Sequence, residues 1–274
     1  MRAWFNGQLL DDPSGASLSV ADHGFTVGDG VFESIKTLQG VPFALTRHLT
    51  RLARSATGLG LDAPDDAVVR RGVADVLAGT EDPLGRLRIT YTAGPAPMGS
   101  GRGVGPASLV VAYSAIEPVG ATTAVTTVPW PRNERGATAG LKTTSYAENV
   151  IALAQATERG ATEAIFANTV GNLCEGTGSN VFYVVDGQLR TPSLASGCLA
   201  GVTRALVLEW CGGVEVDEPI REVAEQMSEA FLVSTLRDVQ AIRRWDDREL
   251  TSPGPVTAEC AHTWAQREAE HPDP

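Results

Sequence analysis

The sequence predicts an α/β protein of the α+β type with two domains, and three observations lead to this prediction. At 274 residues the chain is long enough for two cores of moderate size. Segments with the period-two alternation of strands are interspersed with amphipathic segments that have a helical period. Residues 115–120, which include Pro118, interrupt these patterns. We therefore expect a small α/β domain over 1–116 and a larger domain over 120–274.

The composition excludes several functional classes. A net charge of −11 and a pI near 4.8 argue against nucleic-acid and anionic-membrane partners, because such partners attract clusters of Lys and Arg. The cysteines form no CxxC pair and the histidines add no ligand spacing, so we expect no metal site. Residues 1–7 lack an apolar signal region, and no apolar run reaches membrane-spanning length. We therefore expect a cytoplasmic protein with reduced thiols.

The first part of the chain predicts a hairpin, a strand and helices. Residues 4–10 form a hairpin around an Asn-Gly turn, and a glycine-rich turn precedes the alternating strand over 31–37. Residues 45–58 predict a helix with Thr46 as its cap, and residues 63–79 predict a second helix. No helix opens after the glycine-rich turn, so it is not a phosphate-binding P-loop.

Strands and a long loop follow. Residues 86–92 alternate, with two arginines and a threonine on one face, and further strands are expected over 108–114 and 121–128. The Gly- and Pro-rich residues 94–105 cannot form regular structure. They are either a plain surface connection or an active-site loop, because long loops inside domains are often functional.

The last part of the chain alternates between helices and strands. The helix over 146–159 groups Val150, Ile151, Leu153 and Ala154 on one side. The other expected elements are strands over 163–168, 180–185, 214–216 and 230–235, and helices over 202–210, 223–228 and 256–270, the last a surface helix.

Lys142 is the residue around which the chain is organised. Only two of the 22 Lys and Arg residues are lysines, Lys36 and Lys142, and arginines stay protonated and make poor nucleophiles. Lys142 follows a Gly-Leu step just before a predicted helix. In a dry pocket, a lysine amine loses its proton more readily and can form a Schiff base with a carbonyl. A surface lysine before a helix is the alternative, which this stretch alone does not exclude.

Motifs elsewhere in the chain favour the functional interpretation. His-Leu-Thr-Arg-Leu at 48–52, the Lys142 stretch, Glu-Gly-Thr-Gly-Ser-Asn-Val-Phe at 175–182 and Leu-Ala-Gly-Val-Thr-Arg at 199–204 occur in this order. Together they resemble the class IV aminotransferases, which are fold-type IV pyridoxal-phosphate enzymes. That group includes branched-chain and D-amino-acid aminotransferases, R-selective amine transaminases and aminodeoxychorismate lyases. The resemblance runs from about residue 4 to about residue 242.

The resemblance implies a barrel-like sheet in the larger domain, a homodimer, and pyridoxal 5'-phosphate between the domains. Lys142 would hold the cofactor and act as the catalytic base. Glu175 would keep the cofactor's ring nitrogen protonated, because an adjacent negative charge favours the protonated form. Tyr146 would donate to the ring oxygen and Leu199 would pack under the ring. Lys36 is the rival lysine, but its strand offers no acidic anchor at the family's spacing.

Phosphate binding is assigned to four residues. The resemblance makes Arg51 a phosphate ligand, since a planar guanidinium binds phosphate oxygens in a fork. Val202 and Thr203 open a predicted helix, where free backbone N–H groups bind anions. The hydroxyls of Thr203 and Thr235 would add further donors.

The substrate pocket is expected to take residues from several strands and loops. The resemblance places Phe32 and Ser34 toward the substrate, and Arg88 where branched-chain aminotransferases carry a pocket-lining arginine. Arg102 would close over an anionic substrate, and the backbone N–H groups of Leu236 and Arg237 would take a carboxylate. Many D-amino-acid aminotransferases and aminodeoxychorismate lyases have an arginine where this chain has Ala93, so neither specificity transfers directly.

The resemblance leaves two enzymatic functions open. The leading one is a transaminase that moves an amino group between an amino acid (D-amino acid, branched-chain amino acid or R-amine) and a 2-oxo acid. The alternative is a 4-amino-4-deoxychorismate lyase, which releases 4-aminobenzoate and pyruvate. A third interpretation, a non-catalytic cofactor-binding or scaffold protein, conflicts with the retention of both Lys142 and Glu175.

Overall fold

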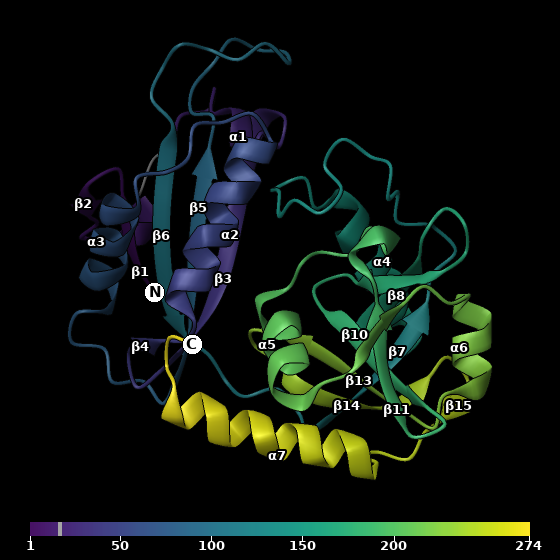
Figure 1. Cartoon of the computed structure of the whole chain (residues 1–274). Coiled ribbons are helices and arrows are strands. Elements are labelled where there is room, and N and C mark those ends of the chain that lie inside the picture. The colour runs from purple at the N-terminus through teal and green to yellow at the C-terminus, as the bar shows by residue number, and fades with distance from the viewer. Residues whose placement is uncertain (16–17) are drawn as a thin grey trace. The chain divides into compact units, whose positions relative to one another are not determined.

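The computed structural model describes residues 1–15 and 18–274 and divides into two compact units (Figure 1). The first unit comprises Met1–Pro118, Leu141–Ser145 and Pro272–Pro274, and the second comprises Val119–Gly140 and Tyr146–His271. Lys142 therefore belongs to the first unit, although it follows the predicted boundary in sequence. The assignment of 1–116 and 120–274 as domains stays a prediction.

The first unit is an antiparallel sheet with helices packed against it, in the strand order β2-β1-β6-β5-β3-β4. Its strands are β1 (Arg2–Phe5), β2 (Gln8–Leu9), β3 (Gly30–Leu38), β4 (Val41–Pro42), β5 (Leu84–Thr92) and β6 (Ser108–Ala115). Its helices are α1 (His23–Thr26), α2 (Leu45–Gly58), α3 (Asp66–Leu77) and the short 3-10 helix η1 (Pro13–Gly15). The predicted Asn-Gly hairpin turn joins β1 to β2, with positive φ at both turn residues.

The alternation predicted for β5 is confirmed. Leu87 and Ile89 are fully buried in the core of the first unit, whereas Arg86 is exposed and Arg88 is half-buried on the opposite face. Residues of α2 and α3 fill the same core, so the two helices pack on one face of the sheet. Burying this face supplies the main free energy that holds the helices on the sheet.

The start of α2 differs from the prediction. Thr46 is not the helix cap, because Ala44 occupies the cap position with φ 54° and no side-chain hydrogen bond. Thr46 instead donates from its N–H and its hydroxyl to the carboxylate of Asp273, at 2.9 and 2.6 Å. The acceptor comes from the far end of the chain, so no local sequence pattern could predict it.

The second unit is a mixed sheet with the strand order β12-β11-β10-β13-β14-β7-β8-β9, and β15 pairs with β14. β9 also contacts β10, so the sheet curls, and this confirms the expected barrel-like form. The strands are β7 (Thr122–Thr127), β8 (Glu163–Ala167), β9 (Leu173–Gly176), β10 (Asn180–Val185), β11 (Gln188–Pro192), β12 (Val214–Val216), β13 (Glu229–Ser234), β14 (Asp238–Trp245) and β15 (Arg248–Glu249). The helices are α4 (Ala147–Glu158), α5 (Val202–Cys211), α6 (Ile220–Gln226), α7 (Pro255–Glu270) and the short 3-10 helix η2 (Leu194–Ser196).

Helix α4 does not bury the side on which the sequence groups its larger apolar residues. Asn149, Ala152 and Ala156 are buried, whereas Val150 and Ile151 are 64% and 57% exposed. Small alanines let the helix approach Ala124, Ala164 and Phe166 of the sheet closely. The larger apolar side chains that the sequence groups on one side of the helix therefore form an outward face.

Helix α7 is held at its beginning by a buried carboxylate. Glu229 accepts hydrogen bonds from the N–H and the hydroxyl of Thr257, both at 2.8 Å. Negative charge is favourable at this end of a helix. Cys260 and Trp264 are buried along one face, so the predicted surface helix is packed on one side. No helix among the described residues is long and apolar enough to span a membrane.

Candidate active site

The backbone around Lys142 is held by the sheet and the first helix of its unit. The carbonyl of Lys142 accepts a hydrogen bond from the N–H of Phe32 at 3.0 Å, and the N–H of Thr144 donates to Gly30 O at 2.8 Å. The N–H of Lys142 donates to the hydroxyl of Ser55 on α2 at 3.2 Å. These contacts explain why a segment distant in sequence belongs to the first unit.

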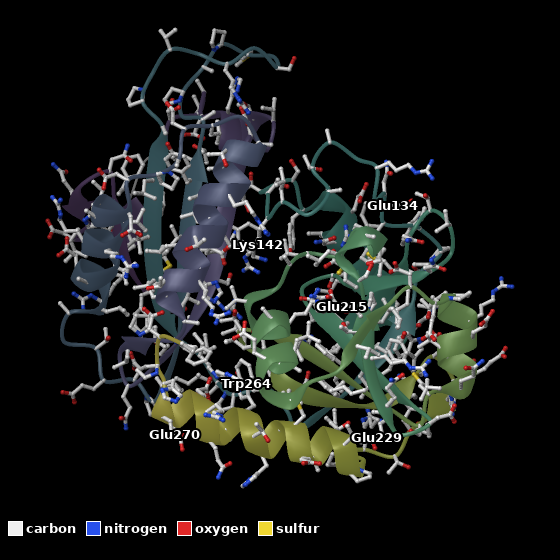
Figure 2. The ribbon with its side chains drawn as sticks, viewed as in Figure 1. Glu134, Lys142, Glu215, Glu229, Trp264 and Glu270 are labelled. Carbon is white, nitrogen blue, oxygen red and sulfur yellow. The ribbon has the colours of Figure 1, made fainter. Side chains whose placement is uncertain are left out.

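The side chain of Lys142, which is labelled in Figure 2, lies against an aromatic ring. Its Nζ is 4.4 Å from the ring centroid of Phe32, and the guanidinium carbon of Arg88 is 3.4 Å from the same centroid. Ser34 pairs with Arg88 across β3 and β5. Three predicted substrate residues therefore gather with Lys142 on one face of the first sheet. The positions of Lys142 and Arg88 over the Phe32 ring are favourable, because the face of an aromatic ring attracts cations.

The opposite face of β3 carries a buried ion cluster. Glu33 is fully buried, and its carboxylate accepts hydrogen bonds from Nε and Nη2 of Arg51 at 2.7 and 2.6 Å. Nδ1 of His48 lies 2.7 Å from the same carboxylate. Burial alone would raise the pKa of Glu33, but the charges of Arg51 and His48 and their hydrogen bonds lower that pKa to about 2.

The pKa of the neighbouring His48 imidazole is lowered as well, which favours its neutral form. Burial lowers the pKa of His48, and the positive charges of Arg51 and Lys142 lower it further against the attraction of Glu33. Arg51 was predicted to bind phosphate, and the structure fixes its guanidinium on Glu33 in the bidentate geometry that orients an arginine most firmly. The phosphate role itself stays a prediction.

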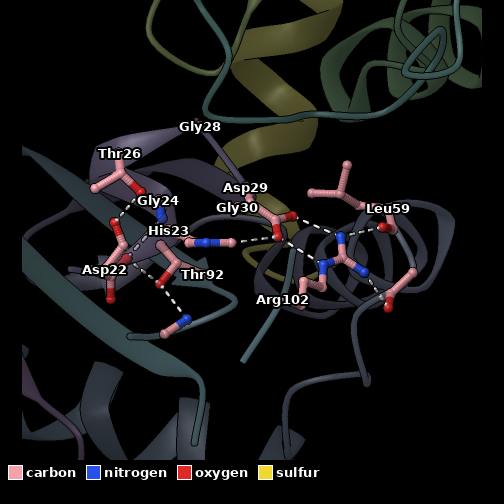
Figure 3. A network of polar contacts seen from close by, with 12 residues as sticks. Asp22, His23, Gly24, Thr26, Gly28, Asp29, Gly30, Leu59, Thr92 and Arg102 are labelled. Carbon is pink, nitrogen blue, oxygen red and sulfur yellow. Dashed lines mark hydrogen bonds and ion pairs between the residues drawn. The ribbon is translucent and has the colours of Figure 1, made fainter. Parts of the chain in front are cut away.

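Arg102 is engaged in a network at the glycine-rich turn before β3 (Figure 3). Its Nε and Nη2 each donate to the Asp29 carboxylate at 2.7 Å, and its remaining donors reach the carbonyls of Leu59 and Gly60 at the same distance. Nδ1 of His23 lies 3.6 Å from Asp29. The hydrogen bonds from Arg102 lower the pKa of Asp29 against the effect of burial.

These bonds anchor the loop over 94–105 to the end of α2. A guanidinium that already satisfies a carboxylate and two carbonyls must exchange them before it can bind a substrate anion. The substrate role of Arg102 therefore stays a prediction, and its observed contacts hold the loop against Asp29 and the carbonyls of Leu59 and Gly60.

In the second unit, Glu175 lies near the end of β9 and is 13% exposed at its side chain. Its Oε2 accepts the backbone N–H of Leu199 at 2.8 Å, and its Oε1 lies 3.3 Å from Nε of Arg132. Arg132 also stacks over the Phe166 ring at 4.2 Å. Sequence reasoning missed Arg132, because it reaches β8 through an isolated bridge to Asn168 that leaves no local pattern.

Tyr146 belongs to the same group of residues. Its hydroxyl donates to the carbonyl of Thr177 at 3.2 Å, and Nδ2 of Asn149 donates to the same oxygen at 2.9 Å. Burial, followed by the charge of Glu175, raises the pKa of Tyr146. The hydroxyl therefore stays protonated and able to donate at neutral pH, although its predicted bond to a cofactor oxygen stays a prediction.

The Gly-Thr-Gly-Ser-Asn loop after Glu175 folds onto another buried carboxylate. Oε1 of Glu163 accepts the N–H of Thr177 at 2.9 Å and also its hydroxyl, while Oε2 accepts the hydroxyl of Ser179 at 2.8 Å. Arg237 lies 3.5 Å from the same carboxylate. Sequence reasoning missed Glu163, because a single acidic residue at the start of a strand carries no functional signal.

At the beginning of α5, the backbone lies close to the side chain of Asn180. Nδ2 of Asn180 donates to the carbonyl of Leu199 at 2.9 Å, and Gly201 is the cap residue before Val202 and Thr203. A Cβ at position 201 would lie 2.1 Å from Oδ1 of Asn180, so only glycine fits there. The first turn of α5 therefore presents the backbone N–H groups that helix beginnings leave without intrahelical partners.

The last of the predicted site residues, Thr235, Leu236 and Arg237, lie in the turn between β13 and β14. The N–H of Arg237 donates to Ser234 O at 3.1 Å, and its guanidinium donates to Gln240 and to Thr162 O. Thr235 is half-buried in the same turn. Carboxylate capture by Leu236 and Arg237, and phosphate binding by Thr235, stay predictions.

Comparisons with known proteins agree with these features. The chain matches the model of the family Amino-transferase class IV over residues 30–245. It is 30% identical to a Methanocaldococcus jannaschii protein named as a branched-chain-amino-acid aminotransferase, over 92% of this chain and 90% of that protein. It is 29% identical to the D-alanine aminotransferase of Bacillus licheniformis, over 94% and 93%. The aminodeoxychorismate lyase of Bacillus subtilis is 28% identical, over 75% and 72%.

Solved structures show the same architecture. The branched-chain aminotransferase of Thermoproteus uzoniensis with norvaline superposes with a TM-score of 0.88 at 28% identity, over 97% of this chain and 94% of that one. A fold IV-transaminase from Curtobacterium pusillum has a TM-score of 0.82 at 33% identity, over 93% and 92%. The chain therefore belongs to the class IV aminotransferases. Members of this family are pyridoxal-phosphate enzymes, and most of the relatives named above are transaminases.

The Glu33 cluster leads to a prediction about stability. Glu33→Gln leaves Arg51 buried without its counter-charge, so we expect the free energy of unfolding at neutral pH to fall by about 3–5 kcal/mol. The pKa of Glu33 is lowered from 4.5 to about 2 by folding, so its contribution is present above pH 4.5 and is lost as the pH falls toward 2. Urea unfolding at a series of pH values should show a steeper loss for the wild type than for the variant.

The exposed Glu117 provides the matched control. Glu117→Gln should change neither the stability at neutral pH nor its dependence on pH. Equal pH slopes for the wild type and Glu33→Gln would contradict the assignment of this stabilisation to Glu33.

Proposed function

We propose that this chain is a pyridoxal-phosphate-dependent transaminase that moves an amino group between an amino acid or R-amine and a 2-oxo acid. One observation carries the proposal: within the class IV framework, Lys142 is held on the first sheet beside Phe32 and Arg88, and Glu175 is held by Leu199 and Arg132. These two side chains are the amine and the carboxylate that the family's chemistry needs. Lys36 is buried in β3, over the Phe43 ring.

The residues present fit the cofactor. Glu175 would face the protonated ring nitrogen, and Tyr146 would donate to the ring oxygen. Arg51, Val202, Thr203 and Thr235 would hold the phosphate. The absence of a side chain at Gly201, where a Cβ would collide with Asn180, lets the backbone before α5 lie against Asn180, and the first turn of this helix has free N–H groups that would bind the phosphate.

Bound pyridoxal phosphate supplies an electron sink for the pair left behind when the substrate carbon loses its proton. Lys142 would hold the cofactor at rest, and its amine, once released, would take that proton and deliver it to the cofactor. Glu175 would keep a negative charge at the ring nitrogen, and Arg132 beside it favours the ionised carboxylate. Phe32 and Leu199 would exclude water from the reacting group.

Substrate selection is assigned to residues of both units. Arg88 would bind a substrate carboxylate, and the small Ser34 would leave room for the substrate side chain. Arg102, Leu236 and Arg237 remain proposed contacts for anionic groups. The similarity to both branched-chain and D-amino-acid enzymes supports a transaminase without selecting the handedness of its donor.

Aminodeoxychorismate lyase is the alternative function. The similarity to the Bacillus subtilis lyase supports it, and the same lysine, carboxylate and phosphate contacts would serve that reaction. Ala93 replaces the arginine that many family lyases carry at this place, and this departure favours the transaminase.

A homodimer is part of the proposal. Val150 and Ile151 are 64% and 57% exposed on α4, and Leu153 adds to the same outward face. Apolar side chains concentrated on one helix favour burial against another protein surface. A second copy of the chain is the partner that the family resemblance implies.

The first prediction from this proposal is that Lys142 is the lysine that binds the cofactor. After incubation with pyridoxal phosphate, borohydride reduction and digestion, mass spectrometry should find the reduced cofactor on the peptide with Lys142. Lys142→Ala should lose this label and at least about 10²-fold of the transamination rate, because the catalytic base is removed. Lys36→Met is the matched control and should keep the label. A labelled Lys36 peptide in the wild type would contradict the assignment.

The second prediction concerns the reaction. With single donors and no acceptor, the yellow holoenzyme should lose its visible absorbance with at least one of D-alanine, L-leucine, L-glutamate or an R-amine. Lys142→Ala should not respond to any donor, because it lacks the base. Failure of every donor, together with release of 4-aminobenzoate and pyruvate from aminodeoxychorismate, would establish the lyase instead.

The third prediction concerns assembly. Light scattering should give the wild type the mass of two chains, and the double variant Val150→Asp/Ile151→Asp should shift to one, because charge opposes burial of this face. Glu158→Gln, on the exposed last turn of the same helix, should leave the dimer intact. A monomeric wild type, or an unchanged double variant, would rule out this face as the interface.

A further inference from the structure

The second unit contains a pocket that the proposed active site does not use. Its volume is about 510 Å³, and it is lined by the end of α5, the beginning of α7, the β10–β11 turn and the start of β12. The lining includes Trp210, Cys211, Glu259 and Cys260. It contains none of the residues assigned to the cofactor or the substrate.

The two cysteines of this pocket are in contact. Cys211 is the last residue of α5 and is half-buried, whereas Cys260 is buried in α7. The thiol of Cys211 donates a hydrogen bond to the carbonyl oxygen of Cys260, with 3.7 Å between Sγ and O. Helices α5 and α7 pack together, so the fold holds these thiols side by side.

The two thiols differ in acidity. The interaction with the Cys260 side chain lowers the pKa of Cys211 against the effect of burial, whereas the interaction with Cys211 and burial raise the pKa of Cys260. Burial raises the pKa of Cys174 and of Cys198, the latter to about 11. A thiolate is the reactive form of cysteine, so Cys211 is the thiol in the chain best prepared to react.

We infer that Cys211 is a site of oxidative modification, at which a hydroperoxide entering the pocket produces a reversible Cys211–Cys260 disulfide. The Cys211 thiolate attacks one peroxide oxygen, so an S–O bond forms, the O–O bond breaks, and water or an alcohol leaves after protonation. The Cys260 thiol then attacks that sulfur, an S–S bond forms and water leaves. The two sulfurs together lose two electrons, and the peroxide gains them.

The modification links the end of α5 to α7. Trp210 precedes Cys211, and its ring centroid lies 5.1 Å from that of Trp264 on α7, which is labelled in Figure 2. A new covalent bond beside this pair should change the indole environment. Tryptophan fluorescence therefore provides a reading of the reaction that is independent of transaminase activity.

The test uses the purified full chain and hydrogen peroxide. Intact mass should fall by two hydrogens without added oxygen, peptide mapping should find Cys211 joined to Cys260, and dithiothreitol should restore both the mass and the fluorescence. Cys260→Ser should stop at a sulfenic acid on Cys211 that dimedone captures, and Cys211→Ser should form no disulfide. Cys198→Ser is the control and should behave as the wild type.

A second measurement on the folded wild type removes any dependence on variant folding. Limited iodoacetamide should label Cys211 at least about tenfold faster than Cys174 or Cys198, since thiolate fraction and access control the rate. Alkylation at Cys211 should then block the disulfide. Faster labelling of Cys174 or Cys198, a different disulfide, or oxidation of Cys211 to sulfinic acid without a disulfide would overturn the inference.

Discussion

The buried carboxylate of Glu33 is the constraint on which the first unit depends. It lies in the middle of β3, and Arg51 and His48 of α2 both contact it. These two contacts together fix the position of α2 along the strand and its rotation about its own axis. The same helix presents Ser55, which accepts the N–H of Lys142. A buried ion cluster is costly to form, but once formed it tolerates few alternative arrangements. Orientation of the Lys142 segment is thus linked to a polar contact on the opposite face of β3.

The second unit uses buried carboxylates in the same way. The carboxylate of Glu163 accepts hydrogen bonds from Thr177 and Ser179, and that of Glu175 accepts one from the N–H of Leu199. The carboxylate of Glu229 accepts the N–H of Thr257 at the beginning of α7. Loops rich in glycine lose much conformational entropy on folding, so a conformation held by several charge-assisted hydrogen bonds offsets that loss. The cofactor chemistry proposed for this chain therefore depends on loops that carboxylates have already ordered.

Sequence periodicity located most helices and strands, but it does not show which face of a helix is buried or which residues distant in sequence are in contact. In α4 the larger side chains Val150 and Ile151 point outward, because small Ala152 lets the helix lie close to the sheet. The cap predicted at Thr46 binds Asp273 instead. Strand β14 was not predicted, and the sequence did not indicate that Asp29 accepts hydrogen bonds from Arg102, whose substrate role stays a prediction. The partners of Thr46 and Arg102 lie far away in sequence, so no local pattern indicates these two contacts.

The sequence by itself determined the family and the chemical types at the site: a retained lysine, a carboxylate before Gly-Thr-Gly-Ser-Asn, and a glycine before a helix. Such features are local, because they depend on residue identity, short-range backbone conformation and spacing along the chain. Only the tertiary structure decided which groups meet: Arg51 with Glu33, Arg132 with Glu175, and Cys211 with Cys260. These contacts depend on how strands pair and how helices pack. Pairing and packing bring together segments whose separation in sequence gives no periodic signal.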